Sequence, residues 1–186
     1  MSDDGVEFLV RGTREAYRSP YLVVREEDVT FPDGSPGLYS IVEKEDFSLV
    51  IPVLPSGSLC LVSVYRHPVR QRFWEFPQGS CAKPGEPAPS PLETARTELR
   101  EETGYRAARW ERLGELHEAY GYATGSCHVY TASGLRRGTA SPEPSEGLLH
   151  TQEFTREAVW RMVGRGEVRD AVTVAALGLY EHRRKG

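Results

Sequence analysis

Three glutamates, Glu98, Glu101 and Glu102, are the residues of this sequence whose types and spacing most clearly suggest chemistry. They lie in a run of good helix formers, Leu92 to Thr103, which Gly104 is expected to end. At positions i, i+3 and i+4, their carboxylates project from one helix face within reach of a single ion. Carboxylates crowded in this way repel one another, so a neutralising cation is expected. Because every ligand is an oxygen, the sequence predicts a hard ion, Mg²⁺ first and Mn²⁺ second.

Paired glutamates on a helix more often form a solvated face than a metal site. The surrounding sequence is therefore needed to tell the two apart. Before the helix, the stretch from Gly79 to Ser90 is rich in glycine and proline and is expected to form a loop that carries Glu86. On another face of the helix, Leu92, Ala95 and Leu99 are suited to packing against a sheet. The segment therefore combines a loop, an apolar helix face and a carboxylate face.

This arrangement resembles the signature of the Nudix hydrolases, G-x5-E-x7-R-E-U-x-E-E-x-G-U, where U is a bulky apolar residue. The second half matches at every position except one, because Thr97 stands where the family has arginine. The first half is longer, with six residues between Gly79 and Glu86 and ten between Glu86 and Thr97. Extra residues in a loop cost little. Arg96 and Arg100 are each turned about 100° from Thr97 on a helix, so either could replace the arginine only by wrapping back.

The segment before this signature, called the box below and spanning Gly79 to Tyr105 in this chain, carries a second resemblance. Tyr65-Arg66-His67-Pro68 and then Trp74-Glu75-Phe76-Pro77-Gln78-Gly79 are similar to Y-R-x-P and W-E-[LF]-P-x-G in the branch acting on ADP-ribose and sugar nucleotides. The resemblance implies that Arg66 binds substrate phosphates, that Glu75 helps to shape the pocket floor, and that the Gln78 backbone carbonyl is a metal ligand. The simpler explanations are a solvated or ion-paired arginine and a buried hydrogen-bond acceptor.

The resemblance also implies a reaction. Cations held by Glu98, Glu101, Glu102 and the Gln78 carbonyl would offset the charge of a pyrophosphate and orient a water for in-line attack on phosphorus. The proton of that water would pass to Glu102 or to a loop glutamate. Glu146 is the best placed of these, with Glu143 and Glu153 behind it, although a solvated loop acid is the simpler explanation. For ADP-ribose the products would be AMP and ribose 5-phosphate.

Two other functions are compatible with the sequence. About 16 residues after the box, where ADP-ribose hydrolysing relatives often have a proline, this chain has Tyr120, Gly121 and Tyr122. Tyrosine at this place is similar to the dinucleoside polyphosphate hydrolases, so an enzyme acting on those nucleotides or on NADH is one alternative. The other is a catalytically silent nucleotide-binding module, because Thr97 cannot brace the glutamates as arginine does.

The first 45 residues are predicted to form a β subdomain ahead of a Nudix domain over residues 46–186. A strand from Tyr21 to Val29, a turn at residues 31–34 and a strand from Gly37 to Lys44 make a hairpin. Such a hairpin is marginal alone and must dock on something. In the sugar-nucleotide branch a similar sheet exchanges across a homodimer. The resemblance implies a homodimer in which Tyr21 and Tyr39 contact the adenine ring, although tyrosines that merely cover the sheet are the simpler explanation.

The remaining patterns predict an α/β (α+β) fold, with a mixed sheet sandwiched between helices. Phe47 to Leu54 and Ser58 to Tyr65 are too apolar for edge strands and should lie centrally. Further strands are predicted over residues 110–119 and 127–132. Thr155 resembles the first residue of a capping box, opening a helix through Met162 that Gly164 and Gly166 end. Asp170 is expected to cap a final helix over residues 171–182.

Composition and charge fit one soluble domain. The chain has 186 residues, 39% of them hydrophobic and 27% charged. A net charge of −4 gives no electrostatic reason to expect nucleic acid or a membrane surface as a partner. The cysteines Cys60, Cys81 and Cys127 have no metal or disulfide spacing, which favours a reducing cytoplasm. A signal peptide and a membrane span are not expected.

Overall fold

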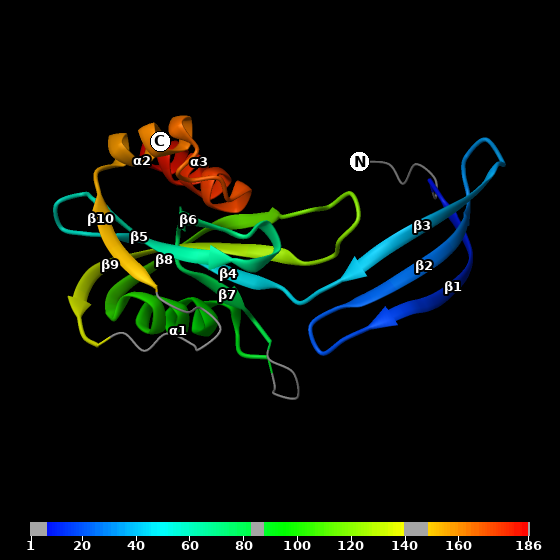
Figure 1. The fold of residues 1–186 in the computed structure, drawn as a ribbon, viewed down its shortest axis with the longest axis horizontal. Coiled ribbons are helices and arrows are strands. Elements are labelled where there is room, and N and C mark those ends of the chain that lie inside the picture. Colours follow the sequence, from blue (N-terminus) through cyan, green and yellow to red (C-terminus); the bar gives the residue numbers. More distant parts are fainter. Residues whose placement is uncertain (1–6, 83–87, 140–148, 186) are drawn as a thin grey trace.

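The computed structural model describes residues 7–82, 88–139 and 149–185 of the chain. A large mixed sheet is covered on one face by α1 (Pro91–Thr103) and on the other by α2 (Arg156–Arg165) and α3 (Ala171–Lys185) (Figure 1). A smaller sheet, built from the N-terminal residues, extends to one side of this body. The predicted α+β class, with helices on both faces of a mixed sheet, is confirmed.

The large sheet has the strand order β10-β5-β4-β9-β8, with β6 paired to β5 and β7 paired to β4. The strands β4 and β9 are parallel, and the other pairs are antiparallel. As predicted, β4 and β5 lie inside the sheet, because apolar side chains on both of their faces are buried. The bounds are β4 Phe47–Val53, β5 Leu59–Arg66, β6 Gln71–Glu75, β7 Gln78–Ser80, β8 Tyr105–His117, β9 Ser126–Arg137 and β10 His150–Phe154.

The central strands β4 and β5 frame the segment that leads into the box. They pair at Val53 and Leu59, beside the turn that joins them. Further along, β6 pairs with β5 and β7 pairs with β4, and the amide of Val50 donates to the Pro77 carbonyl at 2.9 Å. Residues 75–79 therefore run between the two central strands, where α1 covers one face of the sheet.

The helix α1 forms where the sequence predicts it. Its first turn is fixed by a capping box, in which Ser90 accepts from the Glu93 amide and the Glu93 carboxylate accepts from the Ser90 amide. Its end is fixed by Gly104, whose φ of 74° is a left-handed conformation that suits glycine. Ala95 and Leu99 are buried in a core between α1 and the sheet. A second core lies between the sheet and the helices α2 and α3.

The N-terminal sheet has three strands, β1 (Leu9–Arg18), β2 (Val23–Thr30) and β3 (Pro36–Glu43) in that order, all antiparallel. The predicted hairpin corresponds to β2 and β3, and the prediction of two strands was incomplete. The strand β1 was missed because nearly all its side chains are exposed, so its sequence shows no buried face. The β8–β9 loop joins this sheet to the body, since the Val42 amide donates to the Tyr122 carbonyl at 2.7 Å.

Helix limits near the C-terminus differ slightly from the prediction. Thr155 is the N-cap of α2, accepting from the Ala158 amide, but Ala158 has no carboxylate to complete a capping box. The helix continues through Gly164 and ends at Gly166, whose φ is 72°. Asp170 caps α3 as predicted, because its Oδ2 accepts from the Thr173 amide at 2.8 Å. Within the described ranges, no helix is long and apolar enough to cross a membrane.

Candidate active site

Two of the three box glutamates contact strand β7. Glu102 is 2% exposed, and its Oε2 accepts a hydrogen bond from the Gln78 amide at 3.2 Å. Glu98, one turn earlier on α1, lies against Gly79, where an added Cβ would overlap its carboxylate. Gly79 therefore makes room for a carboxylate, which gives a physical reason for a glycine at the start of the box. Glu98 and Glu102 reach the same short strand, which also carries the Gln78 carbonyl.

The third glutamate has a different partner. Glu101 Oε1 lies 2.7 Å from Arg100 Nη2, so its carboxylate is paired with its neighbour on α1. Arg96, the other arginine beside Thr97, has its guanidinium 5.9 Å from the centre of the Trp110 ring. Of the two arginines that could replace the missing one, Arg100 contacts a box glutamate and Arg96 packs on an aromatic ring.

A divalent ion is the group that this donor set would hold. Among the residues that the structure describes, no three His, Cys, Asp or Glu side chains are gathered into a metal-binding group. The donors that α1 and β7 bring together are all oxygens: the carboxylates of Glu98 and Glu102 and the backbone carbonyl of Gln78. Oxygen donors suit a hard ion such as Mg²⁺. Glu101 would join them by exchanging Arg100 for the ion.

Arg66 and Glu75 form a two-point ion pair beside this cluster. Arg66 Nε donates to Glu75 Oε2 at 3.1 Å, and Arg66 Nη2 donates to Glu75 Oε1. Glu75 is 1% exposed, whereas 46% of the Arg66 side chain remains exposed. The simpler explanation of Glu75, a buried acceptor, is confirmed. The pair fixes the guanidinium at the end of β5 while leaving one of its sides open to solvent.

Electrostatics keep this pair charged. Burial acts to lower the pKa of the Arg66 guanidinium, but its hydrogen bond to Glu75 and the nearby carboxylates raise that pKa above its usual value. Burial raises the pKa of the Glu75 carboxyl, and the bond to Arg66 opposes this. Because both Glu75 oxygens accept N–H groups, the carboxyl is ionised in this geometry. Arg66 is therefore a fixed positive charge at the edge of the carboxylate cluster.

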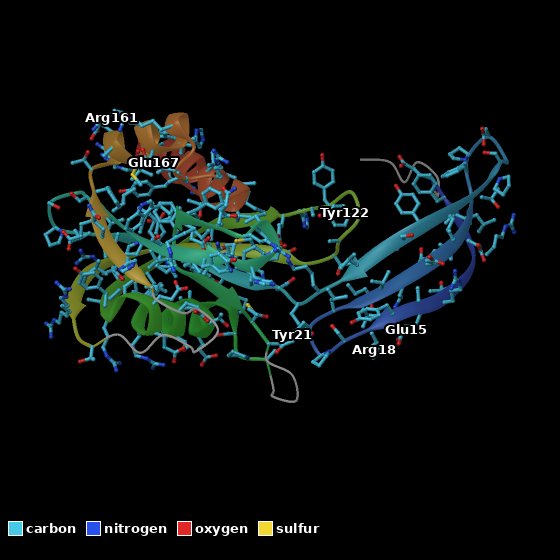
Figure 2. All side chains as sticks on the ribbon, viewed as in Figure 1. Glu15, Arg18, Tyr21, Tyr122, Arg161 and Glu167 are labelled. Atoms are coloured by element: carbon cyan, nitrogen blue, oxygen red, sulfur yellow. The ribbon has the colours of Figure 1, made fainter. Side chains whose placement is uncertain are left out.

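Of the tyrosines predicted to contact the adenine base, Tyr21 lies in the turn between β1 and β2 and Tyr39 lies on β3. Tyr21 is 77% exposed and lines a cavity of about 340 Å³, together with Arg18, Arg25 and Lys44. Tyr39 packs on Phe8, with 5.7 Å between the ring centres. Figure 2 shows Tyr21 near the junction between the two sheets, and Tyr122 on the loop that reaches across this junction. The structure therefore separates the two tyrosines, with Tyr39 further along β3.

Only one of the three loop and strand glutamates predicted as general bases lies among the described residues. Glu146 and Glu143 lie outside the described residues. Glu153, on β10, accepts a hydrogen bond from the Tyr105 hydroxyl at 2.7 Å. Burial and this bond raise the pKa of Tyr105 to about 12. Asp170 was predicted only as a helix cap, and its contact with Gln78, at 3.3 Å from Nε2 to Oδ2, was missed. No local pattern signals that contact, because it joins residues 92 positions apart.

The family follows from comparison with known proteins. A model of the Nudix domain matches residues 48–177, and a model of the nucleoside diphosphate sugar hydrolase N-terminal domain matches residues 10–42. The chain belongs to the Nudix family, in the branch that includes ADP-ribose and sugar-nucleotide pyrophosphatases.

Two relatives are both named ADP-ribose pyrophosphatase. The chain is 32% identical over 159 residues to the ADP-ribose pyrophosphatase of Mycobacterium tuberculosis, covering 84% of this chain and 74% of that protein. It is 31% identical over 152 residues to the ADP-ribose pyrophosphatase of Bacillus subtilis, covering 81% and 80% respectively.

A solved structure shares the fold. The crystal structure of an ADP compounds hydrolase matches with a TM-score of 0.83 at 22% identity, covering 100% of this chain and 98% of that one. The match extends over both sheets, because it covers the whole chain. At this identity it shows the fold alone.

Proposed function

We propose that this chain hydrolyses the pyrophosphate bond of ADP-ribose or a related nucleoside diphosphate sugar, releasing a nucleoside monophosphate and a sugar phosphate. The observation that carries the proposal is the contact of Glu98 and Glu102 with the Gln78–Gly79 segment. Relatives named ADP-ribose pyrophosphatase support the substrate class. The N-terminal match to a nucleoside diphosphate sugar hydrolase domain supports the sugar nucleotide.

The metal ligands in this proposal are Glu98, Glu101, Glu102 and the Gln78 carbonyl, with Mg²⁺ as the ion and Mn²⁺ as a substitute. Bound ions offset phosphate charge and lower the pKa of water. Glu102 is held by the Gln78 amide, so its carboxylate has a fixed orientation before substrate binds. Gly79 leaves space for the Glu98 carboxylate on the same strand.

Arg66 is the proposed phosphate ligand. A guanidinium has five N–H donors, and Glu75 engages two of them in Arg66. The buried carboxylate therefore acts as a brace, and the exposed side of the guanidinium faces solvent, from which a phosphate can approach. Glu75 contributes to the pocket floor by fixing Arg66.

Glu146 is the proposed general base, with Glu102 as the other candidate and Glu101 as a supporting carboxylate. Glu153 is the weaker candidate, because it already accepts a bond from Tyr105. A base must lie within hydrogen-bond reach of the attacking water. Glu146→Gln should therefore lower kcat far more than Glu153→Gln.

A homodimer in the cytoplasm is also part of the proposal, with residues 1–45 as the exchanging subdomain and 46–186 as the Nudix domain. The exposed apolar side chains of the N-terminal sheet, among them Leu9, Tyr17 and Leu38, support a partner surface there. Tyr21 and Tyr39 would then contact adenine. The net charge of −4 supports neither nucleic acid nor a membrane as a partner.

A second candidate is hydrolysis of a dinucleoside polyphosphate or NADH. The β8–β9 loop favours it, because Tyr120 is 86% exposed and Tyr122 lies on the same loop. Exposed aromatic rings are suited to stacking on a second base. The silent nucleotide-binding module, suggested by Thr97, is a third possibility that the same experiment tests.

The test is product analysis of the purified chain with Mg²⁺ and a panel of ADP-ribose, a nucleoside diphosphate sugar, a dinucleoside polyphosphate and NADH. We expect AMP and ribose 5-phosphate from ADP-ribose as the preferred reaction. The double variant Glu101→Gln/Glu102→Gln should lose it, whereas the control Glu157→Gln, on the surface of α2, should retain it. Preferred cleavage of the dinucleoside polyphosphate, or equal turnover by the double variant, would contradict the proposal.

A further inference from the structure

We propose that Asp170 is a positioning residue for the carboxylate site, acting through Gln78 in addition to capping α3. The proposal rests on the function proposed above, in which the Gln78 carbonyl is a metal ligand. It starts from the position of Gln78, which is held from both faces of the sheet. Its amide N–H donates to Glu102 of α1 at 3.2 Å, and its side-chain Nε2 donates to Asp170, the residue that caps α3, at 3.3 Å.

One side-chain oxygen of Asp170 accepts both the bond from Gln78 and the bond that caps α3. Oδ2 accepts from the Thr173 amide at 2.8 Å and from Gln78 Nε2. Because Asp170 Oδ2 is the acceptor of this bond, the amide of Gln78 turns its NH₂ group toward Asp170. The first turn of α3 therefore fixes the orientation of the Gln78 side chain. With its backbone N–H held by Glu102, this leaves the Gln78 carbonyl little freedom to rotate.

Gln78 also links Asp170 to the proposed phosphate ligand. The Gln78 side chain also acts to lower the pKa of the Glu75 carboxyl, which places the two side chains next to each other, and Glu75 holds Arg66. One chain of contacts therefore runs from the start of α3 through Gln78 and Glu75 to Arg66.

The rest of this segment is anchored without Asp170. The Phe76 amide donates to Thr173 Oγ1 at 3.2 Å, and the Trp74 amide donates to the Glu167 carbonyl at 3.0 Å. Thr173 is fully buried. Removing the Asp170 carboxylate should leave these anchors in place and release chiefly the Gln78 side chain. The effect should therefore appear in ion binding before it appears in folding.

Two substitutions separate the cap from the positioning role. Asp170→Ser retains an oxygen that caps α3, since serine and aspartate are similar N-caps. The serine side chain is, however, too short to place that oxygen within reach of Gln78. Asp170→Asn retains an acceptor of the original length. We expect Asp170→Ser to weaken Mn²⁺ binding about 10-fold, the scale of a lost partner behind a metal ligand, and Asp170→Asn to restore most of it. Melting temperature should change little in either variant.

Mn²⁺ binding, measured by electron paramagnetic resonance without substrate, is the main readout. Gln78→Leu removes the same contact from the other side and leaves the cap intact, so it should weaken binding similarly. In that background Asp170→Ser should have no further effect. Thr155→Ser, which alters the cap of α2, is the matched control and should bind Mn²⁺ as the parent does.

Parent-like Mn²⁺ binding by Asp170→Ser would overturn the proposal, as would an undiminished effect of that change in the Gln78→Leu background. If Asp170→Ser does not fold, Gln78→Leu decides, and parent-like binding by it is the contrary result. Because binding is measured without turnover, an inactive parent chain that still binds Mn²⁺ would refute the proposed function and leave this test intact. The kinetic counterpart is a higher Mg²⁺ requirement with ADP-ribose and a nearly unchanged KM.

Discussion

The carboxylate site and the N-terminal sheet solve the problem of placing functional side chains in opposite ways. At the site, Glu102 and Glu75 are almost fully buried and each has hydrogen-bond partners within the chain. On the N-terminal sheet, Tyr17, Tyr21 and Leu38 are exposed, and side chains extend from both faces of the sheet (Figure 2). The first region is completed by the fold of one chain, whereas the second has unburied apolar surface that suits a partner.

This difference has an energetic basis. The helix α1 and the strands β4 and β9 share an apolar core that includes Val50, Leu99 and Ala132, so the site is part of a cooperative body. A small sheet exposed on both faces has little apolar burial of its own. The catalytic rate should therefore not depend on whether two chains associate, whereas binding of the adenine base should depend on it. Three substitutions test this division, and a fourth tests the contact between Tyr105 and Glu153.

The largest effect is expected from Glu102→Gln. The change keeps an acceptor for the Gln78 amide but removes a buried negative charge, so kcat should fall at least about 100-fold. The melting temperature should hold or rise, because repulsion from Glu98 and Glu101 is relieved. Steady-state kinetics and calorimetry measure both. A loss of activity accompanied by a lower melting temperature would contradict the prediction that Glu102 acts in catalysis and not in folding.

Gly79→Ala should have the next largest effect. The added methyl would displace the Glu98 carboxylate, which is the flexible end of a side chain, so stability should change little. The Mg²⁺ concentration for half-maximal activity should rise about 10-fold. Gly164→Ala is the matched control, since the added methyl would meet no group from another part of the described structure within 4 Å. It should keep parent kinetics and stabilise the chain by about 0.5–1 kcal/mol.

Tyr21→Ala moves the test to the N-terminal sheet. If this tyrosine stacks on the adenine base, KM for ADP-ribose should rise about 2- to 13-fold, from the loss of about 0.5–1.5 kcal/mol of aromatic contact. The Mg²⁺ requirement should stay at the parent value, because the carboxylate site is untouched. Initial-rate kinetics at several chain concentrations would measure this. An unchanged KM would make Tyr21 a surface residue.

The smallest effect concerns alkaline pH. The pKa of Tyr105 is raised to about 12 by burial and its bond to Glu153, above the unfolded value of about 10. Its contribution to stability is therefore complete below pH of about 10 and is lost as pH rises through about 12. Urea unfolding of Tyr105→Phe should show a shallower loss of stability above pH of about 10. An identical slope in parent and variant would contradict the assignment.

Sequence patterns predicted the parts of the structure that depend on local periodicity. The helix α1 followed from helix formers ending at Gly104, and β4 and β5 followed from side chains that are apolar on both faces. The strand β1 has no such pattern, because its residues are exposed. The Asp170–Gln78 contact was missed because α3 meets β7 only when the chain is folded. Helical spacing also left open whether Arg96 or Arg100 would contact a box glutamate, and the structure pairs Arg100 with Glu101.

Anomalous diffraction from crystals soaked with Mn²⁺ and a non-hydrolysable ADP-ribose analogue would test the central claim most directly. We predict an ion bound by Glu98, Glu102 and the Gln78 carbonyl, with Glu101 turned from Arg100 toward it and the pyrophosphate alongside. An analogue bound with its pyrophosphate elsewhere, or an ion that does not contact these glutamates, would contradict the proposed site.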